Sequence, residues 1–241
     1  MTLFSFFNKP KIEFYPIIPE LLETFPPDNG KKDIANIFKN IKPSKLNPEL
    51  NYTSEVNLKN CPAIIEYYKY GHVIRLWQDI HIRTSEDGEY YEWKSATNTE
   101  KYASEYLKQN TYFNNEISHF PKEMYSPYFY RDNTLKFILQ IPTRWCIKLP
   151  KDYGALFLPV WYDNEERFTV IPGLLPAGTD QQINVAIQWN KLGTEEVLKA
   201  GTPIVKIIPF KMEKNNITVR QVTKEDASTF KKFSLLKNNH F

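Results

Sequence analysis

The chain has 241 residues, which is enough for one large domain or two small ones with a buried core. Its 31 basic and 28 acidic residues give a formal net charge of +3 and are mixed along the chain, so the composition indicates neither a nucleic-acid nor a membrane partner. Aromatic residues make up 15% of the chain, whereas glycine occurs only eight times. This balance favours aromatic strands and side-chain contacts over glycine loops.

The start of the chain has no basic segment followed by a long apolar run and a cleavage site, and its apolar residues 3 to 7 are too few to span a bilayer. Two cysteines, Cys61 and Cys146, are too few for a disulfide scaffold. We therefore expect a protein made without secretion. Phe4, Phe6 and Phe7 would dock on the chain's own core or on a neighbour, or form a disordered tip.

The first 60 residues form a proline-rich part with little periodicity. Prolines at positions 10, 16, 19, 26, 27, 43 and 48 interrupt it, which favours an extended arm laid over another surface. Within this arm, residues 11 to 15 predict a short edge strand. Residues 32 to 41 predict a single helix with an apolar face.

Residues 61 to 98 predict a β-hairpin. The second half of the segment 71 to 83 alternates apolar and polar residues, as a half-buried strand does. The sequence Ser-Glu-Asp-Gly at residues 85 to 88 is a turn signal, and the aromatic residues 89 to 93 can return beside the first strand. A helical insertion is predicted next, over residues 99 to 120, with Thr99 as its cap.

Residues 135 to 212 predict a compact β module. Extended structure begins at residues 135 to 139, and five further apolar stretches separated by turn residues have the spacing of a folded barrel. These five are residues 145 to 149, 155 to 158, 168 to 170, 183 to 189 and 203 to 210. A tight turn is predicted at residues 199 to 203. Thr223 and Asp226 predict the capped start of a terminal helix over residues 223 to 237.

Two blocks of motifs resemble an uncharacterised family of proteins from cyanophages and other tailed phages. The upstream block is Cys61-Pro62, Gly-His-Val-Ile at 71 to 74, Trp77 and Asp79. The downstream block is Pro150, Tyr-Gly-Ala-Leu-Phe at 153 to 157, Pro172-Gly173, Asp180, Ile-Asn-Val at 183 to 185, and residues 201 to 210. The resemblance runs from about residue 11 to residue 210. It implies a phage origin and a structural or accessory role, and it brings no established activity.

The β module also resembles the β-clip barrel of trimeric dUTPases and dCTP deaminases, in which a Gly-rich turn and an apolar strand close the barrel. In that family an Asp of the central hairpin orients the attacking water, and a glycine-rich tail closes over the nucleotide. Here Asp180 is the candidate for that Asp, but residues 172 to 180 depart from the family motif and no glycine follows Gly201. The resemblance implies a barrel and a homotrimer, while the missing tail removes backbone donors for a triphosphate.

Six residues are candidates for ligand binding, and none is assigned a catalytic role: Trp77, Asp79, His81, Tyr153, Asp180 and Gln188. Asp79 and His81 lie two positions apart on a predicted strand and could share a metal with His72 or His119, although solvent-facing polar residues give the same pattern. No phosphate loop or dinucleotide fingerprint occurs, and we expect neither a metal nor another cofactor.

Aromatic runs supply the candidate interface residues. Tyr67 and Tyr68 belong to one run, and Tyr128 and Tyr130 belong to another. Such residues suit a protein partner, although the first run could equally stack on bases or sugars, or pack inside the chain.

The sequence thus predicts a mainly β protein of the α+β kind, with a β-clip-like barrel module, an N-terminal arm, a hairpin region and short helices. We expect a non-enzymatic phage protein, either a virion component or an infection accessory factor, in the host cytoplasm or the virion. It would act by contacts with other phage proteins or with itself. The alternative is a nucleotide-binding or nucleotide-hydrolysing protein derived from the dUTPase-like barrel.

Overall fold

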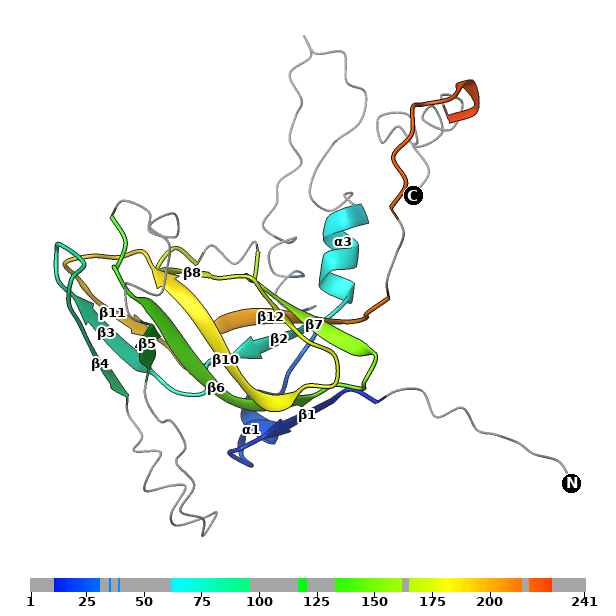
Figure 1. The fold of residues 1–241 in the computed structure, drawn as a ribbon. Coiled ribbons are helices and arrows are strands. Elements are labelled where there is room, and N and C mark those ends of the chain that lie inside the picture. The colour runs from blue at the N-terminus through cyan, green and yellow to red at the C-terminus, as the bar shows by residue number, and fades with distance from the viewer. Residues whose placement is uncertain are drawn as a thin grey trace, which may run out of the picture. The chain divides into compact units, whose positions relative to one another are not determined.

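Figure 1 shows a computed structural model of the chain, which describes residues 11–30, 35, 39, 62–95, 117–120, 133–161, 165–213 and 217–226. The described residues form antiparallel sheets and a few short helices, so the predicted mainly β class is confirmed. The chain divides into two compact units. The first contains Met1–Gly30 and Tyr70–Met212, and the second contains Lys31–Lys69 and Glu213–Phe241.

The largest sheet, which we call sheet A, is built on two long strands that pair with each other, β6 (Ile138–Lys148) and β10 (Asp180–Trp189). Strand β8 (Phe168–Val170) extends it beside β10, while β1 (Glu13–Pro16) and β5 (Ser118–Phe120) both pair with β6. The predicted edge strand near residue 11 is therefore confirmed. The prediction of a helix as far as residue 120 is wrong at its end, because β5 lies there.

Strand β6 joins two stretches that the sequence predicted as separate strands. Pro142 lies in its middle, where proline normally interrupts a ladder. Arg144 takes a positive φ of 65°, and the register of β10 shifts between Gln182 and Asn184. This irregularity accommodates the proline, so the strand continues through it.

Sheet B has the order β2-β12-β7-β9, with β2 (His72–Arg75), β12 (Pro203–Lys211), β7 (Tyr153–Leu158) and β9 (Gly173–Leu175). The predicted turn before β12 is confirmed: Thr202 N donates to Lys199 O over 3.0 Å, and Gly201 has the positive φ, 86°, that such a turn requires.

Sheet C contains the predicted hairpin, formed by β3 (Ile80–Thr84) and β4 (Tyr91–Ser95). The segment 71 to 83, taken above as one region, is divided between β2 of sheet B and β3 of sheet C. Strand β11 (Glu195–Leu198) pairs with the other edge of β3. It was not predicted, because two glutamates at its start hide its apolar residues.

The buried apolar residues of the three sheets form one core in the first unit. Trp145 of β6 and Trp189 of β10 are its largest members, at 1% and 0% exposure. Helix α1 (Leu21–Thr24) adds Leu21 to the same core. The core therefore includes part of the segment that the sequence assigned to an extended arm.

The described part of the second unit contains helix α3 (Pro62–Lys69), which was not predicted. Its proline at the first helical position was a start signal, and the aromatic run beside it hid the helical spacing of Ile64 and Tyr68, which are both buried. Of the predicted helix at residues 32 to 41, only Ala35 and Lys39 are described, and both are helical. Residues 99 to 116 lie outside the described part.

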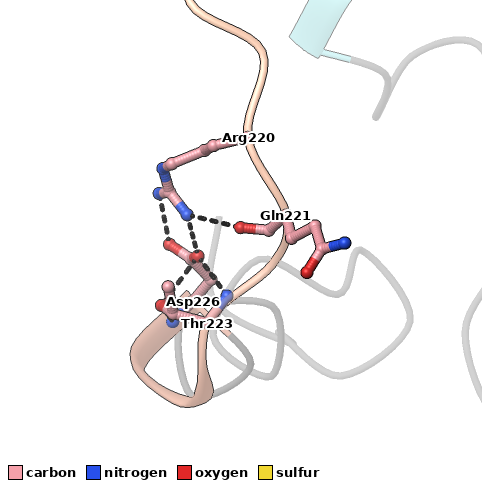
Figure 2. A network of polar contacts seen from close by, with 4 residues as sticks. All are labelled: Arg220, Gln221, Thr223 and Asp226. Carbon is pink, nitrogen blue, oxygen red and sulfur yellow. Dashed lines mark hydrogen bonds and ion pairs between the residues drawn. The ribbon is translucent and has the colours of Figure 1, made fainter.

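The predicted cap of the terminal helix is confirmed. Asp226 N donates to Thr223 Oγ1 over 3.3 Å, and Thr223 N donates in return to Asp226 Oδ2 over 2.8 Å (Figure 2). Arg220 holds the same carboxylate with both terminal nitrogens (Figure 2). Residues 227 to 237 of this predicted helix lie outside the described part.

Candidate functional site

The candidate carboxylate Asp180 lies in a polar cluster on sheet A. Strand pairing places Glu13, Lys148 and Asp180 in one row across β1, β6 and β10. The next row on the same face contains Tyr15, Cys146 and Gln182. Three strands far apart in sequence therefore build the surroundings of Asp180.

Both oxygens of the Asp180 carboxylate have partners in this cluster. The phenol of Tyr15 donates to Oδ1 over 2.5 Å, and the ammonium of Lys148 lies 3.6 Å from Oδ2. The hydrogen bond to Asp180, together with burial, raises the pKa of Tyr15. Burial also raises the pKa of the Cys146 thiol. The phenol thus acts as a donor that holds β1 to β10, and the neutral thiol is a weak nucleophile.

Asp79 lies just before β3, so it is not part of the strand on which the sequence placed it. Its carboxylate accepts hydrogen bonds of 2.8 Å from Lys199 Nζ and from Ala200 N, and these bonds lower the pKa of Asp79. The arrangement fixes the turn that precedes β12.

His81 lies on β3, with Nδ1 3.7 Å from Glu195 Oε1. The two histidines considered as further metal ligands lie on other sheets. His72 of β2 packs against Phe14 at 5.0 Å between ring centres, and His119 of β5 bonds the Tyr91 hydroxyl over 2.8 Å through Nδ1. Among the described residues, no group of three His, Cys, Asp or Glu side chains is placed to hold a metal ion.

Trp77 is half-buried and packs against the core rather than presenting an open ring. The guanidinium of Arg144 lies 5.9 Å from the centre of that ring. Arg144 is only 1% exposed, and this burial lowers its pKa to about 10. The pair is a cation–π contact inside the protein.

Gln188 does not lie beside Asp180, and Tyr153 lies on a different sheet. Tyr153 begins β7 in sheet B and pairs with Lys211. Gln188 is buried, and its amide donates to Thr134 Oγ1 over 3.2 Å. Because Gln188 and Asp180 lie eight residues apart on one strand, about 26 Å separates them. Gln188 and Asp180 therefore do not share one small binding site.

Of the predicted interface residues, only Tyr67 and Tyr68 lie in the described part. Their rings meet edge to face on α3, 5.3 Å apart. Tyr68 is 3% exposed, so it is packed inside the chain. Phe4, Phe6, Phe7, Tyr128 and Tyr130 lie outside the described residues.

The structure also shows exposed apolar side chains that the sequence analysis did not identify. Leu156 of β7 and Leu174 of β9 are register partners, and their exposed fractions are 37% and 52%. We call these two residues the β7–β9 patch. Ile217, Val219 and Val222 are also strongly exposed. Ile217 and Val219 alternate with a polar residue, which was a usable signal, whereas the apolar runs of β7 and β9 do not show which of their side chains are exposed.

No family model matches the chain, and no curated protein matches it. Among solved structures, the chain is similar to the dUTPase of Staphylococcus bacteriophage 80alpha with dUPNHPP, with a TM-score of 0.37 and 7% identity over 89% of this chain and 90% of that one. A variant of that dUTPase with dUpNHpp gives a TM-score of 0.27 and 11% identity over 36% of this chain and 75% of that chain.

A dUTPase variant from phage phi11 of S. aureus is also similar, with a TM-score of 0.27 and 10% identity over 36% of this chain and 72% of that one. At such scores the likeness carries no argument about function.

No helix among the described residues has the length and apolar character needed to cross a membrane.

Proposed function

We propose that this chain is a non-enzymatic phage protein that acts through protein–protein contacts, as a virion component or an infection accessory factor. The phage origin is supported by the sequence motifs that resemble the tailed-phage family. The contact role is supported by the exposed apolar β7–β9 patch, because exposed apolar side chains suit a partner surface and β9 has no second partner strand among the described residues.

One observation carries the non-enzymatic part of the proposal: both candidate carboxylates are engaged inside the chain. Asp180 is held by Tyr15 and Lys148, and Asp79 is held by Lys199 and the Ala200 amide. A carboxylate that orients water for hydrolysis needs an oxygen directed at that water. Here the hydrogen bond from Tyr15 to Asp180 holds β1 to β10, and the hydrogen bonds to Asp79 fix the turn before β12.

A turnover assay tests this part. Purified protein is incubated with dUTP, dCTP and the other deoxynucleoside triphosphates in the presence of Mg²⁺, and the products are separated by chromatography. We expect the wild type and Asp180→Ala to show the same absence of turnover. Turnover that disappears in Asp180→Ala would replace this proposal with the nucleotide-hydrolysing alternative.

A recovery experiment in infected cells tests the contact part. The tagged chain and its Leu174→Asp variant are recovered and compared by mass spectrometry, and purified particles are analysed in parallel. We expect a phage protein that accompanies the wild type and is lost with Leu174→Asp. Presence of the chain in particles would identify a virion component, and its absence there would identify an accessory factor. Equal recovery of every phage protein by both forms would contradict the role of this patch.

A further inference from the structure

The segment of residues 11–30, which we call the strap, is held to the first unit near both of its ends. Near one end, β1 pairs with β6, and Ile17 N donates to Arg144 O over 2.8 Å. Near the other end, Asp28 and Val73 form an antiparallel bridge with two backbone hydrogen bonds, of 3.3 and 2.5 Å. The strap therefore runs from sheet A to sheet B, because β6 belongs to the first sheet and Val73 to a strand of the second.

The middle of the strap contributes to the core of the same unit. Ile18 and Leu21 are 5% and 2% exposed and belong to the core cluster. The Asp28 carboxylate adds an ion pair, with Oδ2 3.1 Å from Arg75 Nε. The strap is thus packed into the first unit, although residues 31–69 of the second unit follow it in the chain.

The chain leaves the first unit and returns to it at neighbouring points. Gly30 and Gly71 each lie two residues from the Asp28–Val73 bridge, and at the same end of it because the bridge is antiparallel. Both glycines have a positive φ, 68° and 80°, a conformation that glycine adopts without steric cost. Hairpin loops of four residues are common. The two glycines with one residue on each side would form such a loop if they were joined directly.

We propose that the first unit is complete without the second, and that residues 31–70 are an insertion between the strap and β2 whose ends meet at Gly30 and Gly71. Folding of the first unit then requires the strap but not the second unit. The sheets that carry the β7–β9 patch therefore keep their structure when the second unit unfolds. This inference goes beyond the proposed function, because it holds equally for a contact protein and for an enzyme.

Tryptophan fluorescence of the full chain reports on the first unit alone. All five tryptophans, at positions 77, 93, 145, 161 and 189, belong to this unit. We expect Leu21→Ala in the strap to lower the urea midpoint of the fluorescence transition by about 1 M or more, because it removes a buried side chain from the core. Tyr68→Ala truncates a similarly buried side chain on α3 and should leave the midpoint unchanged. An equal fall in both variants would overturn the proposal.

Hydrogen exchange in the same full-length variants locates each effect. Tyr68→Ala should speed the exchange of the α3 amides and leave the amides of β6 and β10 unchanged, since separate units open separately. Faster exchange in β6 and β10 would overturn the proposal. If Leu21→Ala does not fold, Ile18→Val removes a single methyl group from the strap and should still give a measurable fall in the fluorescence midpoint.

A variant that joins Gly30 directly to Gly71 and ends at Met212 tests whether the first unit closes. It lacks Tyr70, whose side chain is 63% exposed, and otherwise keeps the whole first unit. We expect a cooperative fluorescence transition near the wild-type midpoint. The matched control begins at Gly71 and also ends at Met212, so it lacks only the strap, and it should show no such transition. Absence of a transition in the joined variant, or the same transition in both variants, would overturn the proposal.

Discussion

The phenol of Tyr15 donates a 2.5 Å hydrogen bond to Asp180, 165 positions further along the chain. Strand β6 lies between the two strands that carry these residues. The bond therefore ties the N-terminal strand across a neighbour to the start of β10. The carboxylate that sequence motifs associate with nucleotide chemistry here has a role in holding the sheet together.

Tyr15→Phe is expected to lower the free energy of unfolding by about 1 kcal/mol, the usual net contribution of such a hydrogen bond. Asp180→Asn should lower it by a similar amount. The double variant should lose little more than either single one, since both remove the same contact. Urea titration measures all three. Tyr70→Phe, at a 63% exposed position, is the control and should change stability by less than about 0.5 kcal/mol. Fully additive losses would show that the two residues are not coupled.

The same bond predicts a pH dependence at the alkaline end. The folded pKa of Tyr15 is raised above the ordinary value of about 10, because the protonated phenol is the donor to Asp180. Its contribution to stability is therefore complete below about pH 10 and is lost as the pH rises toward the folded pKa. The difference in stability between the wild type and Tyr15→Phe should be constant from pH 7 to 9.5 and shrink above that. A difference that grows with pH would contradict this assignment.

Glu165 and Arg167 form a two-point ion pair, with bonds of 2.8 and 2.6 Å, and Arg167 Nη1 also donates to Val197 O over 2.5 Å. The pair thus links the segment just before β8 to β11 of sheet C. Arg167→Gln should cost roughly 1 to 3 kcal/mol, because it leaves a largely buried carboxylate with fewer partners. Lys191→Gln removes the exposed 3.6 Å contact with Glu166 and should cost less than about 0.5 kcal/mol by thermal unfolding. Equal effects would contradict the bridging role.

The loss of stability at acidic pH provides a second measurement of the Glu165–Arg167 ion pair. Burial raises the pKa of Glu165, but the bonds and the charge of Arg167 outweigh it, so the folded pKa lies below its ordinary value. The contribution is therefore present above about pH 4.3 and is lost as the pH falls through the folded pKa. Between pH 7 and pH 3 the wild type should lose more stability than Arg167→Gln.

Gly71 precedes β2 with a φ of +80°, and an added Cβ would lie 2.5 Å from Ile207 O. Gly71→Ala combines a left-handed conformation, which costs about 1 to 2 kcal/mol in an L-residue, with a backbone clash. We expect a loss of about 2 kcal/mol or more in chemical denaturation. Gly173→Ala meets no atom within 4 Å and should be nearly neutral. A neutral Gly71→Ala would mean that β2 can move away from β12.

Local signals predicted much of this fold. The turn at Gly201, the hairpin of β3 and β4, and the cap at Thr223 each depend on residues close in sequence, and the structure contains all three. Strand β6 was predicted as two pieces because a proline usually interrupts a strand, and the compensating positive φ of Arg144 has no sequence signature. Whether a strand continues through a proline depends on how it pairs with its neighbours in the folded protein.

The site was less predictable than the fold. Asp180 was identified from a motif, but its partner Tyr15 belongs to a segment that the sequence analysis treated as a separate arm. Asp79 was predicted on a strand with His81. Its hydrogen-bond donors are instead Lys199 Nζ and Ala200 N, in the turn before β12. Contacts over 120 or more positions depend on the register of several strands, which one sequence does not specify.

Lys206 has a fully buried side chain on β12, and burial lowers its pKa to about 8. Since the unfolded value is about 10.4, the unfolded chain binds more protons between these two pH values, and stability should rise from pH 8 to 10.4. Below pH 8 the buried charge costs roughly 1 to 3 kcal/mol.

Lys206→Met should therefore be more stable than the wild type at pH 7, and this advantage should shrink as the pH rises to 10.4. Thermal unfolding across this range measures it, with exposed Lys151→Met as the control. An advantage that stays constant with pH would show that the pKa of Lys206 is the same in the folded and the unfolded chain, and would contradict this prediction.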